Sequence, residues 1–177
     1  YKMHLRVFLS RWRSSRPCDE CHGARLRPEA LAIRLGGKNI AEVSRLKISE
    51  ALEFIRGLPL TDRERLTGRM MLEQVESRLH YLDMVGVGYL TLDRPIKTLS
   101  AGELQRVALT SALGSSLVNM LYVLDEPSVG LHPKDSDRLF RAVEQLRDRG
   151  NSVVVVEHEE TFLRGADHVI EVGPGAG

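Results

Sequence analysis

LSAGELQR (residues 99–106) and LYVLDEPS (residues 121–128) are the two stretches that decide the fold of this 177-residue chain. In the first stretch, the hydroxyl of Ser100 precedes the carboxylate of Glu103 by three positions, which is typical of a capped helix start. We expect that helix to run to about Ser115. The second stretch belongs to an apolar run, residues 120–124, which ends directly in two carboxylates. This run predicts a buried strand.

A helix and a second strand follow the strand predicted at residues 120–124. Residues 133–149 have helical periodicity and residues 153–156 form another short apolar run; the expected inner face of the helix is Leu139, Val143 and Leu146. Strand, helix and strand in this order imply parallel neighbours with a right-handed connection. A further helix through Leu163 and a strand at residues 168–172 complete the segment. The fold class is therefore α/β, a parallel sheet with flanking helices.

The chain before residue 98 predicts a mostly helical region. Residues 31–35 indicate a short strand that turns at Gly36 and Gly37, and Ser49 indicates the cap of a helix at residues 50–55. TDRE at residues 61–64 is a capping box, and it opens a long helix that ends at residues 86–88. The expected apolar stripe of that helix is Leu66, Met70, Val75, Leu79 and Leu82. We expect Met70 and Met71 to be packing residues.

The net charge of +1 hides an asymmetry along the chain. Residues 1–38 contain nine basic and three acidic residues, a net charge of +6, and the remaining 139 residues carry −5. This basic arm, which also contains Phe8 and Trp12, could lie against phosphates. A solvated face, or a clasp onto a further domain, explains the charge equally well. We divide the chain into the basic arm (1–38), a helical insertion domain (39–97) and an α/β core segment (98–177).

Composition excludes some classes of protein. Hydrophobic residues make up 42% and charged residues 28%, a balance typical of globular and not of disordered chains. No apolar run approaches the ~20 residues that span a bilayer, so we expect no membrane partner and a cytoplasmic location. The first residue is Tyr1 and the sequence stops at GPGAG, so we expect a piece of a longer chain.

Cys18 and Cys21 form a Cys-x-x-Cys pair. Two cysteines do not make the disulfide framework of a secreted protein, and the pair is more typical of half a metal site or of a redox couple. The flanking sequence does not predict the strand and helix of a thioredoxin-like redox site. Metal is therefore the preferred interpretation, with redox chemistry as the alternative.

Three side chains with catalytic potential follow the two predicted strands. Asp125 and Glu126 end the first strand and His158 follows the second. Parallel packing brings both strand ends to one edge of the sheet, where ligands bind in folds of this class. One carboxylate can orient hydrated Mg²⁺ while the other polarises a water, and the histidine can hold a terminal phosphate. Each residue alone has a structural explanation; their joint placement favours a site.

The start of the helix at Ser100 supplies a further element. Free backbone N–H groups at a helix amino terminus bind anions, and the small residues Ala101 and Gly102 permit close approach. Taken with residues 121–128, the whole pattern resembles the signature motif, Walker B strand and D-loop of ATP-binding-cassette (ABC) ATPases, with His158 at the switch-histidine position. The D-loop counterpart includes Ser128 and Gly130.

A phosphate loop should accompany these motifs. The best candidate, Gly36-Gly37-Lys38-Asn39, has Ala32 in place of the first glycine and Asn39 in place of the Mg²⁺-binding hydroxyl. It is better explained as a hairpin turn. We expect the phosphate loop to lie before Tyr1, in a cassette interrupted by an insertion, and the chain alone to hydrolyse no ATP.

Three strings carry a closer resemblance. RPCDECHGARLRPEA (residues 16–30), YLTLDR (residues 89–94) and ADHVIEVGPGAG (residues 166–177) resemble the UvrA family, the damage-recognition ATPases of the bacterial excinuclease. The resemblance covers essentially the whole chain, and it points to the amino-terminal of the family's two cassettes. It implies a dimeric ATPase that binds duplex DNA, surveys it for lesions and loads UvrB in nucleotide excision repair.

The resemblance also implies roles for individual residues. Asp125 would support Mg²⁺, Glu126 would activate water and His158 would contact the γ-phosphate of ATP. The start of the signature helix would close over ATP held by another cassette, and Ser128 and Gly130 would lie at the cassette interface. The closing residues would be Ser100, Ala101, Gly102 and Glu103.

Two departures from the family pattern affect these roles. Ala101 stands where the family usually has a second glycine, and one methyl group is a small obstruction that we expect to weaken ATP closure without abolishing it. Cys18 and Cys21 supply two of the four ligands of a family zinc site. Residues before Tyr1 would supply the others, with His22 and His4 as weaker candidates.

Three alternatives stay open. A UvrA paralogue that confers resistance to DNA-binding drugs would share all of these strings. A transporter motor of the ABC class would share the signature and the Asp-Glu pair, but the Cys-x-x-Cys string and the GPGAG ending argue against it. A non-catalytic zinc-dependent DNA-binding module is disfavoured by Glu126 and His158 at neighbouring strand ends.

Overall fold

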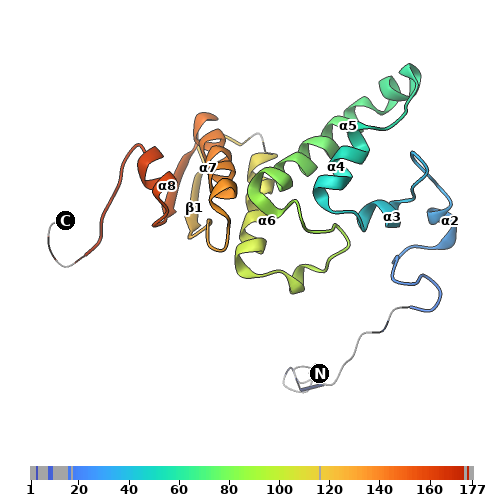
Figure 1. Ribbon diagram of the computed structural model, residues 1–177, viewed down its shortest axis with the longest axis horizontal. Helices are drawn as coiled ribbons and strands as arrows, with labels where there is room; N and C mark the ends of the chain where they lie inside the picture. The colour runs from blue at the N-terminus through green and yellow to red at the C-terminus, as the bar shows by residue number, and fades with distance from the viewer. Residues whose placement is uncertain are drawn as a thin grey trace. The chain divides into compact units, whose positions relative to one another are not determined.

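The chain separates into two parts by its internal contacts, Tyr1–Ala41 and Glu42–Gly177. The computed structural model describes residues 18–115 and 117–173, together with positions 3, 8, 9, 16 and 175 (Figure 1). Part of the predicted basic arm, including Trp12 and four of its basic residues, lies outside the described residues; these four are Lys2, Arg6, Arg11 and Arg13. The expected boundaries at 38/39 and 97/98 stay predictions.

In the first part, a short helix and a tight turn replace the predicted strand. Helix α2 (Pro28–Leu31) has proline in its first turn, where the fixed φ of proline suits a helix. Residues 31–35 were therefore wrongly predicted as a strand. The hairpin turn is confirmed: Leu35 and Lys38 exchange backbone hydrogen bonds of 2.9 and 3.1 Å, and Gly36 and Gly37 have φ of 55° and 81°. Positive φ at both turn positions requires residues such as glycine.

Capping residues set the helices that follow α3 (Ile40–Ser44). Helix α5 (Asp62–Leu82) begins at the predicted capping box, where Thr61 Oγ1 accepts from the Glu64 N–H and the Glu64 carboxylate accepts from the Thr61 N–H at 2.9 Å. Helix α4 (Ile48–Arg56) starts earlier than predicted, with Lys47 as its cap. Ser49 was wrongly predicted as the cap: it lies inside the helix and its hydroxyl donates to the Gly88 carbonyl oxygen at 3.3 Å.

A one-turn π-helix joins the α4–α5 pair to the elements that follow it in the second part of the chain. This element, η1 (Asp83–Val87), directly follows α5 and contains Gly86 at φ 78°, which ends the helix as predicted. It contacts α4, α5, α6 and α7. Val85 and Val87 are fully buried within it. A turn of backbone that four helices surround therefore connects the α4–α5 pair to the elements that carry the predicted site.

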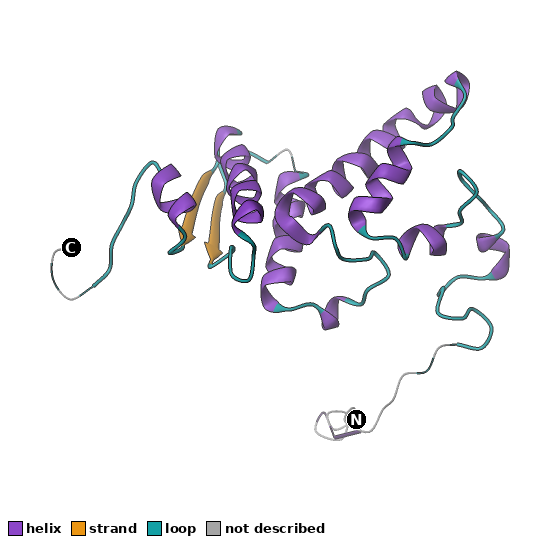
Figure 2. Ribbon diagram, viewed as in Figure 1, coloured by secondary structure: helices purple, strands orange, loops and turns teal. Residues whose placement is uncertain are grey.

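The remaining elements form the α/β segment, which follows η2 (Ile96–Thr98). Its order is α6 (Ala101–Leu113), β1 (Leu121–Asp125), α7 (Pro133–Asp148), β2 (Ser152–Val156) and α8 (Glu160–Gly165). The two strands pair in parallel, with Leu121 opposite Ser152 and Asp125 opposite Val156 (Figure 2). The predicted strand–helix–strand unit and the α/β class are confirmed.

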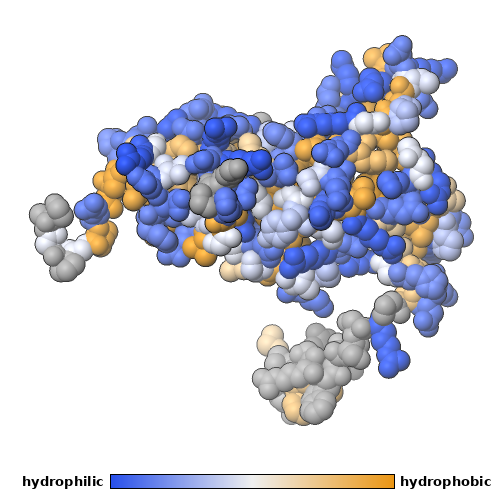
Figure 3. Space-filling model, in the orientation of Figure 1, coloured by the Kyte–Doolittle hydropathy of each residue, from blue (hydrophilic) through white to orange (hydrophobic). Residues whose placement is uncertain are grey.

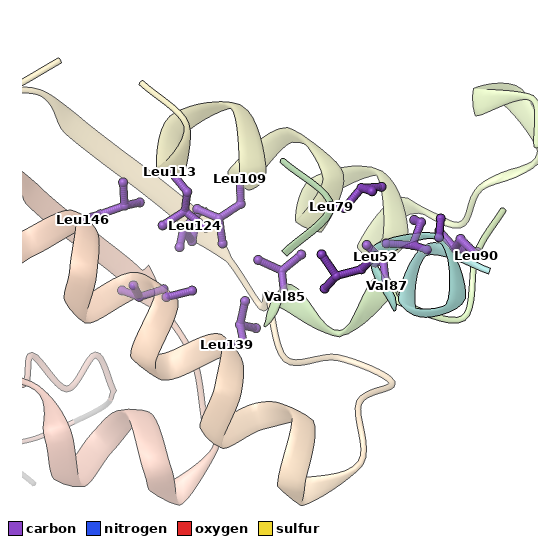
Figure 4. Packing of buried hydrophobic residues seen from close by; sticks show 14 of the residues in the cluster. Leu52, Leu79, Val85, Val87, Leu90, Leu109, Leu113, Leu124, Leu139 and Leu146 are labelled. Atoms are coloured by element: carbon purple, nitrogen blue, oxygen red, sulfur yellow. The ribbon is translucent and has the colours of Figure 1, made fainter. Parts of the chain in front are cut away.

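One buried cluster unites the helices with one face of the sheet. Figure 4 shows Val85 of η1 with Leu113, Leu124 and Leu146 on one side of it and Leu52, Val87 and Leu90 on the other. The predicted inner face of α7 is confirmed, because Leu139, Val143 and Leu146 are all buried. The core therefore runs from α4 and α5 through η1 to α6, α7 and the inner face of the sheet.

The strands are less buried than their apolar composition predicts. Leu124 is buried and Tyr122, Val153 and Val155 pack against the cluster, whereas the alternate side chains Leu121, Val123, Val154 and Val156 are exposed. Burial on both faces was therefore a wrong expectation, since helices of the described part cover one face only. The strand predicted at residues 168–172 is also wrong: these residues are irregular, Val172 is 97% exposed, and no strand within the described part of the chain pairs with them.

The apolar stripe predicted for α5 is confirmed only at its C-terminal end. Leu79 is buried and Leu82 packs against the core, but Leu66, Met70, Met71 and Val75 are exposed. Met70 and Met71 were wrongly predicted as packing residues. Figure 3 shows hydrophobic residues at the surface in the region of α4 and α5. No helix within the described residues is both long and apolar enough to cross a membrane.

This difference along α5 predicts two mutational effects of very different size. Leu79→Ala should lower the free energy of unfolding by about 2–5 kcal/mol, because it leaves a cavity at a position that is 5% exposed. Leu66→Ala, on the same helix at 74% exposure, should change it by less than about 0.5 kcal/mol. Equilibrium denaturation measures both. Equal effects of the two substitutions would contradict the assignment of the core.

Candidate functional site

The predicted catalytic side chains follow the paired ends of β1 and β2. Asp125 lies opposite Val156 in the parallel register, and the Glu126 N–H donates to the Val156 carbonyl oxygen at 2.9 Å. The backbone turns away at Glu126, whose φ is 44°. Asp125, Glu126 and His158 are all exposed. The structure thus brings the three positions to one edge of the sheet and leaves their side chains open to solvent.

Glu157, which the sequence analysis assigned no role, fixes this edge. Its carboxylate accepts from the Ser128 N–H at 2.8 Å, from the His158 N–H at 3.0 Å and from the Glu159 N–H at 3.3 Å. Burial acts to raise the pKa of Glu157, but the hydrogen bonds from Ser128, His158 and Glu159 outweigh it, so the pKa lies below its ordinary value. An ionised Glu157 therefore joins the segment after β1 to the segment after β2.

Two side chains of α6 hold the same segment from the other side. Gln105 Nε2 donates to the Asp125 carbonyl oxygen at 3.0 Å. Arg106 is 4% exposed, and its Nη1 donates to the carbonyl oxygens of Pro127 and Val129 at 3.4 and 3.3 Å. The buried Arg106 Nε has no hydrogen-bond partner among the described residues. Residues 125–129 are thus fixed through alternate carbonyl oxygens.

The predicted D-loop is a tight turn held within this arrangement. The Val129 N–H donates to the Glu126 carbonyl oxygen at 3.1 Å, and the Leu131 N–H donates to the Ser128 carbonyl oxygen at 2.9 Å. Ser128 is buried, and Gly130 has a φ of 76° that favours glycine. A Cβ on Gly102 would lie 3.2 Å from Arg106 Nη1 and 3.6 Å from the Val129 carbonyl oxygen. Gly102 therefore lets α6 approach this turn closely.

The start of α6 has the predicted capping box and one further contact. Glu103 accepts from the Ser100 N–H at 2.7 Å, and the Ser100 Oγ accepts from the Glu103 N–H at 3.2 Å. The Tyr89 hydroxyl donates to Glu103 Oε1 at 2.6 Å, and Arg94 Nη1 lies 3.5 Å from the same oxygen. The hydrogen bond from Tyr89, with those from Ser100, holds the pKa of Glu103 below its ordinary value. Ser100 and Ala101 remain exposed.

Burial, together with the hydrogen bond to Glu103, raises the pKa of Tyr89. The phenol therefore stays protonated and remains the donor to an ionised Glu103. This pair ties the first turn of α6 to residues 89–94. The structure thus gives the predicted ATP-binding end of the helix a fixed attachment to the segment that precedes it.

Cys18 and Cys21 lie in a turn of the first part. The His22 N–H donates to the Cys18 carbonyl oxygen and the Ala24 N–H to that of Cys21, both at 2.8 Å. Hydrogen bonds from the backbone of Cys21 and of Glu20 lower the pKa of the Cys18 thiol. Among the described residues, no group of three or more His, Cys, Asp or Glu is placed to hold a metal ion. His4, a weaker candidate ligand, lies outside the described residues.

Sequence reasoning missed the residues that fix the site, namely Gln105, Arg106, Glu157, Tyr89 and Arg94. Three of them have a signal in hindsight: Glu157 is an acidic residue directly after an apolar strand, and Gln105 and Arg106 are polar residues between the apolar Leu104 and Val107. Gln105 and Arg106 bond to backbone atoms distant in sequence, and Tyr89 and Arg94 reach the side chain of Glu103; residue patterns do not reveal either kind of contact.

The fold and the ordered motifs define a segment of an ABC-type ATPase: a capped signature helix, a strand that ends in Asp-Glu and a histidine after the parallel neighbour. Comparison with known proteins gives the family. The chain is 45% identical over 173 residues to UvrABC system protein A of Clostridium perfringens and 47% identical over 174 residues to that of Methanothermobacter thermautotrophicus. Over nearly its whole length, the chain is thus similar to the UvrA family.

A solved structure supports the same assignment. The crystal structure of UvrA2 from Deinococcus radiodurans matches with a TM-score of 0.79 and 38% sequence identity over 94% of this chain. No family model matches the chain. The aligned region covers 98% of this chain but only 18% of each of the two UvrABC relatives, and 22% of the UvrA2 chain.

The hydrogen bonds to Glu157 predict an effect of pH on stability. Because the folded-state pKa of Glu157 is depressed, its contribution is present above the ordinary carboxyl pKa and is lost as pH falls through the folded value. Glu157→Gln should lower the free energy of unfolding by about 1–3 kcal/mol at pH 7, and by progressively less below about pH 5.

Denaturation across this pH range tests the effect, with Glu160→Gln, an exposed carboxylate paired with Arg164, as the matched control. A loss for Glu157→Gln that is the same at pH 3 and pH 7 would show that its ionised form does not hold the edge.

Proposed function

We propose that the chain is part of the DNA-damage-recognition ATPase subunit of the UvrABC excinuclease, which acts in nucleotide excision repair. The observation that carries this proposal is the identity of 44–48% to UvrABC system protein A over 98% of the chain. The identity to UvrA2 of Deinococcus radiodurans is lower, at 38%. The Asp-Glu pair and the parallel strands support an ATPase in preference to a purely DNA-binding module.

ATP hydrolysis would take place at the edge where β1 and β2 end. Asp125 would hold Mg²⁺, which supplies charge neutralisation for the phosphates, and its exposed carboxylate fits a hard cation with bound waters. Glu126 would orient and deprotonate the attacking water, and His158 would hydrogen-bond the γ-phosphate. The backbone bond from Glu126 to Val156 and the carboxylate of Glu157 support the relative positions of the two segments.

The first turn of α6 would bind the phosphates of ATP held by another cassette. Helix N-terminal N–H groups attract anions, and the exposed Ser100 and Ala101 together with Gly102 leave room for a phosphate. Glu103 would shape this turn through the capping box and its bond to Tyr89. Ser128 and Gly130 would lie at the interface between the cassettes, and Arg106 of α6 bonds to the neighbouring residues Pro127 and Val129.

In this proposal the whole protein is a homodimer that binds duplex DNA and UvrB. The basic charge of residues 1–38, at +6, supports contacts with DNA phosphates. Zn²⁺ would be held by Cys18 and Cys21 with ligands from elsewhere in the protein. The lowered pKa of Cys18 favours the thiolate, which is the form that binds metal.

Glu126→Gln should separate ATP binding from hydrolysis in the full-length protein. The amide keeps the size of the side chain but cannot take a proton from water, so turnover at this cassette should fall by at least about 100-fold while ATP binding is retained. Glu144→Gln on α7, a charge change at a half-buried glutamate, serves as the control. Wild-type turnover of Glu126→Gln would remove Glu126 from the base role, and turnover by the isolated chain would contradict the half-site assignment.

Cys18→Ser should lower the zinc content of the purified full-length protein. Serine is a poor zinc ligand, so elemental analysis should show about one Zn²⁺ fewer per chain, with a lower unfolding midpoint. Arg25 is exposed and its guanidinium is not a zinc ligand, so Arg25→Gln is the control. Equal zinc content in wild type and Cys18→Ser would overturn the metal role of this pair.

A further inference from the structure

A surface pocket of about 470 Å³ lies away from the strand ends. It is formed by α5, by the C-terminal end of α6 with the segment after it, and by Arg149 just beyond α7. Its lining contains two arginines, Arg78 and Arg149, and no carboxylate. The pocket is therefore positively charged, in a part of the chain whose overall charge is negative.

Arg149 is fixed in the wall of this pocket. Its guanidinium donates to the Leu113 carbonyl oxygen, to the Ser115 carbonyl oxygen at 3.4 Å and to the Tyr81 hydroxyl at 3.3 Å. The bond to Leu113 satisfies the last carbonyl group of α6, which has no partner inside the helix. A guanidinium has five N–H donors, so two are left for a ligand.

Tyr81 and Arg78 add further donors. The Tyr81 oxygen accepts from Arg149, and hydrogen bonding from Arg149 and then from Ser77 lowers the pKa of Tyr81 despite its partial burial. With its oxygen occupied as an acceptor, the Tyr81 hydroxyl has its own proton to donate. Arg78 is exposed beside it and forms no hydrogen bond or ion pair with another described residue. The pocket thus offers several donors and positive charge, but no anionic acceptor of its own.

The geometry points to a binding site for a phosphate group in this pocket, contacted by Arg78, Arg149 and the Tyr81 hydroxyl. Guanidinium groups match the spacing of phosphate oxygens and form charge-assisted hydrogen bonds with them. The phosphate can come from a nucleic-acid backbone or from a small molecule, and both sources present the same oxygens. This site is separate from the proposed ATP site and does not depend on the proposed function.

The first experiment uses inorganic phosphate and the full-length protein. Thermal unfolding is followed while phosphate replaces chloride at constant ionic strength. Wild type should show a saturable rise in unfolding midpoint, and the part of the rise due to this pocket should be lost in Arg78→Gln, with an apparent Kd at least about 10-fold higher. Tyr81→Phe should weaken binding in the same direction. Arg69→Gln, a change at an exposed arginine on the same helix that pairs with Glu73, should behave as wild type.

The second experiment identifies the source of the phosphate. Duplex DNA is titrated at several salt concentrations with the same variants. Loss of one phosphate contact makes the plot of log affinity against log salt less steep. A slope whose magnitude decreases by about 0.9 in Arg78→Gln, and not in Arg69→Gln, assigns the site to a DNA backbone phosphate. An unchanged slope with a lost phosphate effect assigns it to a small phosphate-bearing ligand.

The proposal is overturned when Arg78→Gln and Tyr81→Phe match wild type in both experiments. Arg78 is exposed, so its substitution leaves the fold intact, whereas Arg149→Gln also removes the cap of α6 and is less informative. Failure of the wild-type protein to bind DNA would count against the proposed function, and the phosphate titration would still decide the pocket.

Discussion

The segment that follows β1 is held in place by hydrogen bonds to its backbone from two sides. Arg106 and Gln105 of α6 donate to carbonyl oxygens on one side, and the Glu157 carboxylate accepts from the Ser128 N–H on the other. The positions of Glu126 and of the turn at Gly130 depend on these bonds, because the carboxylates at this edge are themselves exposed. Loss of either side would free the segment that carries Glu126 and the turn at Gly130.

The same helix links this segment to the region before it. Glu103, in the first turn of α6, accepts from Tyr89, while Arg106, one turn later, reaches Pro127 and Val129. A displacement of residues 89–94 would therefore act on the start of α6, and through Arg106 on the turn after β1. This arrangement gives a short physical connection between the helical region and the edge where we propose that ATP is hydrolysed.

Residue patterns predicted the elements better than their burial. The capping boxes at Thr61 and Ser100 and the parallel pairing of β1 with β2 were correct, because they depend on local spacing and on connection rules. The outer faces of both strands and the first half of α5 were wrongly expected to be buried, since apolar composition does not show whether a partner is present. The roles of Arg106 and Glu157 were missed because their partners are main-chain atoms distant in sequence.

That preference for main-chain partners bears on how this region tolerates sequence change. Arg106 contacts the carbonyl oxygens of Pro127 and Val129, and Glu157 contacts the N–H of Ser128, so the side chains of these three residues take no part in the bonds. The bonds themselves therefore do not depend on these side chains, although Pro127 and Ser128 are buried and only Val129 is exposed. Arg106 and Glu157 form the bonds with their side chains. Sequence variation in this region should therefore fall on the turn and not on these two residues.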